Sequence, residues 1–334
     1  MRRLLLLLAF LPAACARPRS GASPEIVAEA GDVRVTRVEL EAEAAGRLLP
    51  LKSQEYDTLR ESLEDLLFER LVKREAQARR VSPEVFVQGE LKLDRSAPDP
   101  KEVEAIYQAN RDRLGQRSVA DAKAEIVRLL EEQRAREARS AFRKELFHKA
   151  GVRVYLPPPR SNLQVPADAP VLGPPDARVT LVEFADYECP YCQQAESIVE
   201  GILDKNPKTV RFVLRDFPLD TKHARALPAA EAAHCAEDQG KFFEYRRSLL
   251  GTPGNLSDED LVRRAEGLHL KTDAFRTCLA ARPHEAEIRK SFEDARALGV
   301  SATPTFFVNG RYVEGLRSEG QLQDIIDSEL ATDR

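Results

Sequence analysis

The chain lacks a strong excess of charge of either sign, because 51 lysines and arginines face 55 acidic residues, for a net charge of −4. That balance gives no reason to expect nucleic acid as a partner. Internal repeats are missing too, and the one low-complexity stretch is rich in proline. With 43% hydrophobic and 32% charged residues the composition is that of a globular protein, and 334 residues favour two domains.

Long apolar runs are also absent: Leu4–Leu11 is too short to span a bilayer, and no other segment is apolar enough. This run follows two arginines and precedes small residues, which is typical of a secretory signal peptide, here residues 1–16. Cleavage after Ala16 would discard Cys15, whereas the segment LPAAC resembles a bacterial lipobox with Cys15 as the acylated residue. We therefore expect export to the periplasm or cell envelope, with the mature protein soluble or tethered by a lipid on Cys15.

The first half is predicted to be mainly helical. Ile26–Val35 is expected to form a short hairpin, after which Thr36 caps a helix and Glu39 completes a capping box. A long helix is expected from about Asp121 to Ala150, followed by a returning strand over residues 152–156. Between these segments, leucines recur at helical spacing with charges between them, at Leu59, Leu63, Leu66, Leu67 and Leu71.

This half, residues 25–156, resembles the N-terminal domain of the SurA and PrsA family of extracytoplasmic chaperones. The matching segments are Glu25–Gly31, Thr36–Leu40, the helix around Leu59–Arg79, and Val103–Tyr107. Members of that family carry a parvulin prolyl-isomerase domain after the last segment, but here a helix follows directly, so isomerase activity is not implied. Amphipathic helices suit a dimerisation or spacer domain as well as a peptide-binding surface, and both interpretations stay open.

Seven prolines between residues 157 and 175 predict a stiff, extended linker between two domains. Beyond it, strands and helices alternate. The order is strand, helix, strand, helical insertion, hairpin and helix, expected at Val179–Phe184, Pro190–Leu203, Val210–Leu214, 223–298, Thr305–Glu314 and Ser318–Leu330. Within the insertion Ser257 and Thr272 are predicted to cap helices, and Asn309-Gly310 is the favoured turn pair of a hairpin.

Three motifs of this half resemble, in the same order, those of the DsbA family of thioredoxin-fold proteins. They are Glu183–Cys192, Gly240–Phe243 and Gly299–Gly310. The resemblance implies an α/β thioredoxin fold over residues 163–332 with a helical insertion at 223–298, preceded by the mainly α-helical SurA-like domain. It also implies thiol–disulfide exchange with protein or peptide substrates, no bound cofactor, and a membrane redox partner that reoxidises or reduces the enzyme.

The stretch Cys189-Pro190-Tyr191-Cys192 carries the expected chemistry. Pro190 suits the first turn of a helix, which places Cys189 at the helix N-terminus, where unpaired N–H groups and the dipole stabilise a thiolate. Cys192, three residues on, lies on the same face within disulfide reach. Cys189 is therefore expected to be the exposed attacking sulfur and Cys192 the buried resolving one. The dipeptide Pro190-Tyr191 does not decide whether the pair oxidises or reduces.

The resemblance to DsbA implies further site residues. The Thr303–Pro304 bond is expected to be cis and to face the cysteines, so that Thr303 contacts the sulfurs and a substrate chain pairs alongside. Glu183 is an acid within an apolar strand, and in this family such an acid lies beneath the second cysteine and assists proton transfer. The alternative for Glu183 is an exposed strand acid.

Cysteines 235 and 278 both lie in the insertion, and the resemblance implies a second disulfide between Cys235 and Cys278, with free buried thiols as the alternative. Residues 186–188, two acids around a tyrosine, are expected to line the rim of the site. The five histidines form no cluster in the sequence and none is assigned a role. His234 is expected to be a residue of a helix face.

Other interpretations of the Cys189–Cys192 pair are weaker. A zinc site would need two more ligands, and the chain has no second C-x-x-C or H-x-x-x-H. A purely structural bridge would close too small a loop to constrain the unfolded chain much. We favour a disulfide oxidase. A disulfide isomerase or reductase, dimeric through the N-terminal domain, and a chaperone-like peptide-binding protein with a secondary redox site remain as alternatives.

Overall fold

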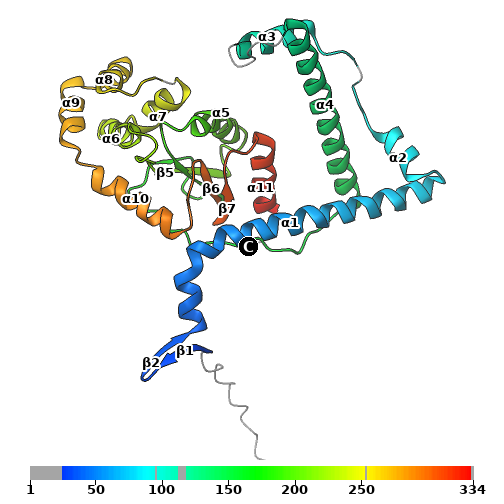
Figure 1. The fold of residues 1–334 in the computed structure, drawn as a ribbon, viewed down its shortest axis with the longest axis horizontal. Coiled ribbons are helices and arrows are strands. Elements are labelled where there is room, and N and C mark those ends of the chain that lie inside the picture. Colours follow the sequence, from blue (N-terminus) through cyan, green and yellow to red (C-terminus); the bar gives the residue numbers. More distant parts are fainter. Residues whose placement is uncertain (1–24, 95, 112–117, 253, 332–334) are drawn as a thin grey trace, which may run out of the picture. The chain divides into compact units, whose positions relative to one another are not determined.

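The computed structural model of the protein is drawn in Figure 1 and describes residues 25–94, 96–111, 118–252 and 254–331. The signal peptide expected at residues 1–16, with Cys15, lies outside these ranges. The chain divides into two compact units: residues up to 50 with 163–308 and 314 onward, and residues 51–162 with 309–313. None of the described helices combines the length and the apolar character needed to cross a membrane.

A β-hairpin opens the described chain, formed by β1 (Ile26–Ala30) and β2 (Val33–Thr36) in antiparallel pairing. Thr36 and Glu39 build the predicted capping box: the Thr36 N–H donates to Glu39 Oε2 at 2.7 Å, and the Glu39 N–H donates to Thr36 Oγ1 at 3.3 Å. The helix that follows, α1 (Arg37–Arg79), is 43 residues long and includes the leucine pattern of the sequence.

The unit of residues 51–162 is helical and has a small apolar core. After α1 come α2 (Pro83–Glu90), α3 (Pro100–Asn110) and α4 (Val119–Ala150), so the predicted long helix is confirmed and begins two residues earlier. The core residues come from α1, α2 and α4 and are Leu71, Val72, Ala76, Phe86, Phe142 and Leu146. The Phe68 and Phe142 rings meet edge to face, with centroids 5.7 Å apart.

The strand expected at residues 152–156 is wrong, because these residues form no strand. The Val152 N–H donates instead to the Phe147 carbonyl at 3.1 Å, which closes the end of α4 around Gly151 in the left-handed conformation (φ +60°). Three prolines then follow at positions 157–159 and offer no N–H groups for a ladder.

A five-stranded sheet in the order β3-β5-β4-β6-β7 follows in the chain. Its strands are β3 (Val171–Leu172), β4 (Val179–Ala185), β5 (Val210–Asp216), β6 (Thr305–Val308) and β7 (Arg311–Glu314). The central strand β4 pairs parallel to β5 and antiparallel to β6. Its buried position explains why its sequence is an almost continuous apolar run.

The helices of this unit are α5 (Pro190–Lys205), α6 (Ala226–Glu237), α7 (Phe242–Gly251), α8 (Asp258–Gly267), α9 (Thr272–Ala281), α10 (Glu285–Ala297) and α11 (Glu319–Ala331). Ser257 caps α8 as predicted, accepting from the Asp260 N–H at 3.3 Å. The cap predicted at Thr272 is wrong, since its hydroxyl donates back to the Leu270 carbonyl and α9 has no side-chain cap. The predicted fold class, a thioredoxin fold with a helical insertion after a mainly helical segment, is confirmed.

Successive side chains of β4 point to opposite faces of the sheet, and this alternation decides which face Glu183 lies on. Glu183 faces α5 and α7, where its carboxylate meets Arg246. Phe184 faces the other way, and the guanidinium of Arg215 lies 5.7 Å from its ring centroid while pairing with Asp294 of α10. The buried ion pair of Glu183 and Arg246 therefore lies on one face of the sheet, and the contact between Phe184 and Arg215 lies on the other.

Substitution of Gly173, which directly follows β3, tests how closely the chain packs at this position. Gly173 has a φ of +94°, and a Cβ added there would lie 2.6 Å from the Val210 carbonyl oxygen. Gly173→Ala should therefore lower the free energy of unfolding by roughly 3 kcal/mol, from the left-handed backbone plus the clash. Gly240→Ala is the matched control, because Gly240 also has a positive φ (+72°) but open space around an added Cβ. It should cost only about 1–2 kcal/mol. Urea denaturation followed by circular dichroism measures both, and equal losses would contradict the close packing at Gly173.

Candidate active site

The two cysteines stand at the start of α5, just beyond the carboxyl end of the central strand. Cys189 occupies the N-cap position with extended backbone (φ −73°, ψ 121°), and Pro190 is the first helical residue. The proline needs no N–H partner there, whereas the N–H groups of Tyr191 and Cys192 do. They interact with the Cys189 sulfur and lower its pKa. Tyr191 itself is exposed beside the site.

Thr303 and Pro304 border the cysteines from the other side. The Thr303–Pro304 peptide bond is cis, and the Cys189 thiol lies 3.5 Å from the Thr303 carbonyl oxygen, to which it can donate. The Thr303 side chain is buried beside this sulfur, and its hydrogen bond to the sulfur is one of the causes that lower the pKa of Cys189. Residues more than one hundred positions apart in the sequence thus meet at one sulfur atom.

The two sulfurs have opposite acid–base properties. A hydrogen bond from Cys192 is the main cause that lowers the pKa of Cys189 to about 5; burial opposes this, and Thr303 and the two backbone N–H groups add to it. Burial raises the pKa of Cys192 well above its usual value. Cys189 is therefore a thiolate and Cys192 a thiol at neutral pH. The expectation that Cys189 is exposed is corrected, since that residue is only 5% exposed and Cys192 is fully buried.

Beneath the cysteines lies a buried group of three charges. Glu183 is fully buried, and its Oε2 accepts from Arg246 Nη2 at 2.8 Å, while the other terminal nitrogen of Arg246 pairs with Glu196 of α5. Burial raises the pKa of Glu183 to about 7, although the Arg246 charge pulls it down. A carboxyl group with this pKa can give up or take a proton at neutral pH, which suits proton transfer to a neighbouring thiol.

Asp186 organises the loop that leads into α5, and the expectation that residues 186–188 line the rim is wrong for its first two members. Asp186 and Tyr187 are each only 1% exposed. The Asp186 carboxylate accepts from the Glu188 N–H and the Leu219 N–H, both at 2.8 Å, and meets His223 Nδ1 at 2.9 Å. Burial opposes protonation of His223, but the hydrogen bond to Asp186, and the charges of Asp186 and Cys189, raise its pKa.

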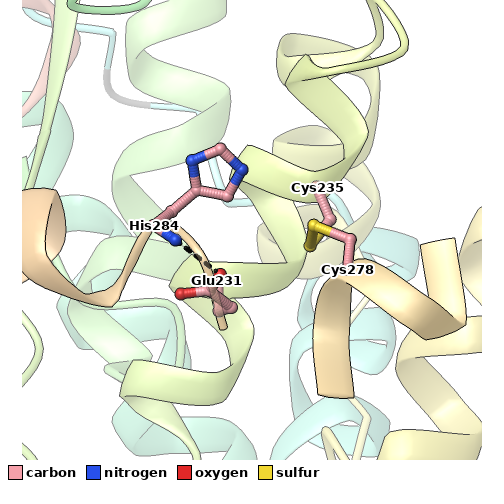
Figure 2. A group of neighbouring side chains, drawn as sticks. All are labelled: Glu231, Cys235, Cys278 and His284. Carbon is pink, nitrogen blue, oxygen red and sulfur yellow. Dashed lines mark hydrogen bonds between the residues drawn. A yellow bond between two sulfur atoms is a disulfide. The ribbon is translucent and has the colours of Figure 1, made fainter. Parts of the chain in front are cut away.

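The helical insertion contains a disulfide between Cys235 of α6 and Cys278 of α9, with a Cα–Cα distance of 5.8 Å (Figure 2). The adjacent His234 lies on a face of α6, as predicted, and this face is buried. Its Nε2 meets Asp216 and its Nδ1 meets Glu237, each at 2.8 Å. Burial alone would lower the pKa of His234, but these two carboxylates raise it to about 11.

Two groups of side chains in the described residues could hold a metal ion, and neither contains the Cys189–Cys192 pair. One is Glu231, Cys235, Cys278 and His284, and the other is His234, His284 and Glu287. The cysteine pair at the start of α5 instead combines a stabilised thiolate, a buried thiol and a nearby buried acid with a raised pKa.

Sequence reasoning missed Arg246, Glu196 and His223. Arg246 is the one charged residue among the buried positions of α7, which is a signal that a pattern search could have used. It stands next to exposed Arg247, however, and helical spacing alone does not say which of two adjacent arginines turns inward. His223 lies in a loop before α6, where no periodicity indicates direction.

Comparison with known proteins fits this geometry. The thioredoxin family model matches residues 167–328. The Na(+)/H(+) antiporter NhaA 3 of Salinispora tropica is 43% identical over 176 residues, which are 52% of this chain and 27% of that protein. NhaA 1 of Mycobacterium sp. (strain KMS) is 35% identical over 147 residues, 43% of this chain and 24% of that protein. The chain thus spans about a quarter of the length of these curated relatives, and the activity in their names is not transferred to it.

Solved structures also match the second half. A thioredoxin-like oxidoreductase from Silicibacter pomeroyi is 36% identical, with 50% of this chain and 95% of that chain covered and a TM-score of 0.47. α-DsbA1 from Wolbachia pipientis is 27% identical, with coverage of 50% and 92% and a TM-score of 0.45. Residues 167–328 therefore form a thioredoxin-type domain, with the cysteine pair at the start of α5.

In the reduced protein, the Cys189 thiolate should titrate with a midpoint near pH 5. This pKa lies below that of an unfolded thiol, so ionisation of Cys189 stabilises the folded reduced protein. The stabilisation is fully present above the pKa of the unfolded thiol, and it is lost as the pH falls through about 5. Thiolate absorbance and the rate of iodoacetamide alkylation measure the midpoint. Cys192→Ala should raise it by removing the main hydrogen bond, and a wild-type midpoint near a free thiol, about 8.5, would contradict the geometry.

Arg246→Met should leave Glu183 and Glu196 as unpaired buried acids. We expect a loss of about 3–5 kcal/mol in the free energy of unfolding at pH 8. In the variant, the pKa values of both acids in the folded protein are raised above those in the unfolded chain. The variant is therefore most stable at low pH, where both acids are protonated, and it loses stability as the pH rises. Its deficit relative to the wild type should be smaller at about pH 5 than at pH 8. The control is Arg247→Met, since Arg247 is 57% exposed and its pair with Glu200 should contribute at most about 1 kcal/mol. Equal effects of the two variants in urea denaturation would refute the buried ion group.

Proposed function

We propose that this chain is an exported thiol–disulfide oxidoreductase that oxidises dithiols of protein substrates through the Cys189–Cys192 pair. The observation that carries the proposal is the contrast between the two sulfurs, with a pKa of about 5 for Cys189 and a raised pKa for Cys192. A stabilised thiolate favours the reduced form of the pair, so the disulfide form is a strong oxidant of other dithiols.

The reaction balances two electrons. A substrate thiolate attacks the disulfide at Cys189 Sγ, forming a mixed disulfide and expelling the Cys192 sulfur, which takes up a proton. A second substrate thiolate attacks the substrate sulfur of the mixed disulfide and releases Cys189 as a thiolate. The substrate dithiol has then lost two electrons and two protons; the Cys189–Cys192 pair has gained two electrons and one proton, and the second proton goes to solvent.

Two neighbours have roles in these steps. Glu183, with its pKa raised to about 7, is the proton donor for the departing Cys192 sulfur, and Arg246 positions its carboxylate without contacting substrate. The Thr303–Pro304 segment borders Cys189, so a substrate chain bound alongside it would present its thiol to that sulfur. Low pKa also makes Cys189 a good leaving group when the mixed disulfide is resolved.

The wider setting is part of the same proposal. A signal at residues 1–16 would export the chain, and a lipid on Cys15 would tether it to the cell envelope. The Cys235–Cys278 disulfide supports an oxidising compartment, where such bonds persist. A membrane redox partner would restore the Cys189–Cys192 disulfide after each turnover. No cofactor enters the steps above.

A second candidate function rests on the N-terminal segment. Six large aliphatic side chains of the first hairpin and the first turns of α1 are exposed: Ile26, Val27, Val33, Val35, Val38 and Leu40. Exposed aliphatic residues of this kind favour binding to another chain. They support the SurA-like prediction of a peptide-binding or homodimeric N-terminal domain, and a dimer would suit an isomerase or reductase. Full holdase activity in the Cys189→Ser/Cys192→Ser variant would favour the binding function over catalysis.

Stoichiometric oxidation tests the proposed function. The oxidised protein, mixed with a peptide containing two cysteines, should form one equivalent of peptide disulfide per chain. Cys189→Ser should form none, because the attacked sulfur is gone. The matched control is Cys235→Ala/Cys278→Ala, which removes two sulfurs away from the site and should oxidise the peptide normally. Mass spectrometry without reductant measures the peptide, and oxidation by Cys189→Ser at the wild-type rate would overturn the assignment.

A further inference from the structure

The disulfide in the helical insertion belongs to a compact group of metal-binding side chains that the redox reaction does not use. Glu231, Cys235, Cys278 and His284 each offer one ligand atom, and these atoms all lie within 4.8 Å of one another (Figure 2). Glu231 and Cys235 are four residues apart on α6, so they share a helix face. Cys278 lies in α9, and His284 directly precedes α10.

Glu231 supplies a second, independent observation. It is only 1% exposed, and its Oε1 accepts from the His284 backbone N–H at 2.9 Å. Its other oxygen, Oε2, is buried and has no hydrogen-bond partner among the described residues. A buried carboxylate oxygen without a partner is costly, and this carboxylate belongs to the same group of possible metal ligands, so a bound cation would offset that cost.

The charged side chains around this group decide which of its members are available to bind a metal ion. Asp238 Oδ2 lies 3.1 Å from His284 Nε2 and 3.7 Å from Cys278 Sγ, so a further carboxylate borders the group and adds negative charge. His234 stacks on His284 with centroids 5.4 Å apart, but both of its nitrogens are engaged by carboxylates, so it is a neighbour and not a ligand. Cys278 and His284 are half-buried, which gives solvent, reductant and metal access to the group.

We propose that the Cys235–Cys278 disulfide masks a zinc site, which forms when a dithiol reduces the bond and then binds Zn²⁺ through Cys235, Cys278, His284 and Glu231. The dithiol is oxidised to a disulfide and transfers two electrons and two protons to the cysteines; Zn²⁺ then displaces the two thiol protons. Two thiolates, one imidazole and one carboxylate make a four-ligand set that suits zinc better than magnesium or calcium. Bound zinc would hold the cysteines reduced, because it stabilises only the dithiol form.

The test uses the full chain with Cys15→Ser, Cys189→Ser and Cys192→Ser, so that only the insertion cysteines remain. A phosphine reductant opens the disulfide without adding competing thiols. Equilibrium dialysis with Zn²⁺ should give one ion per reduced chain and none per oxidised chain. Zinc should also protect both cysteines from alkylation and raise the melting temperature of the reduced protein only.

Ligand variants decide whether the binding site is the proposed one. Glu231→Gln and His284→Ala should each weaken zinc binding by roughly tenfold or more, because each removes a ligand. The control is His269→Asn, which alters an exposed histidine of the same insertion with a residue that tolerates its positive φ (+58°). Its zinc affinity should equal that of the parent.

Three results would overturn the proposal. They are no saturable binding by the reduced protein, equal affinity in the parent and in both ligand variants, and loss of helical circular dichroism on reduction before zinc is added. The last would mean that the disulfide is required for the fold and that no preformed site exists. Because the active-site cysteines are absent, each of these results leaves the proposed oxidoreductase activity unaffected.

Discussion

The site depends on one sulfur atom held where unpaired hydrogen-bond donors converge. Cys189 stands at the N-cap of α5, so it receives the N–H groups that a helix start leaves without partners, and the thiol of Cys192 adds a further hydrogen bond. The sheet fixes the ends of β4 and β6 beside each other, which brings Thr303 to the same sulfur. Because both elements belong to the buried core, the thiolate environment is preorganised in the fold.

The buried charges follow from the same arrangement. Placing a carboxyl group under the cysteines costs solvation, and the structure offsets that cost with Arg246, which bridges Glu183 and Glu196. The buried carboxylate of Asp186, in the loop before α5, is stabilised in a comparable way, because two backbone N–H groups and His223 surround it. These groups are polar but almost completely enclosed, so they define a single arrangement of the loop and of the helix start.

Local sequence predicted the features that depend on local chemistry. Pro190 indicates that a helix starts beside Cys189, and the apolar run of β4 indicates a buried strand. The fold class and the position of the cysteine pair could therefore be predicted from the sequence. Arg246 could not, because nothing local distinguishes it from exposed Arg247. The strand predicted at residues 152–156 was wrong for a related reason. The composition of this segment favours a strand, but no neighbouring strand pairs with it, and the Val152 N–H bonds to the end of α4 instead. The burial of Asp186 could not be predicted either, because its partners Leu219 and His223 are distant in the sequence.

We propose that the fold stabilises the Cys189 thiolate and so makes the Cys189–Cys192 disulfide a strong oxidant. The most direct test of this proposal is the equilibrium reduction potential of the Cys189–Cys192 couple by glutathione titration, in a Cys235→Ala/Cys278→Ala background that removes the second disulfide. We expect a potential well above that of the glutathione couple. A value near that of thioredoxin, about −270 mV, would contradict it and indicate a reductase or isomerase instead.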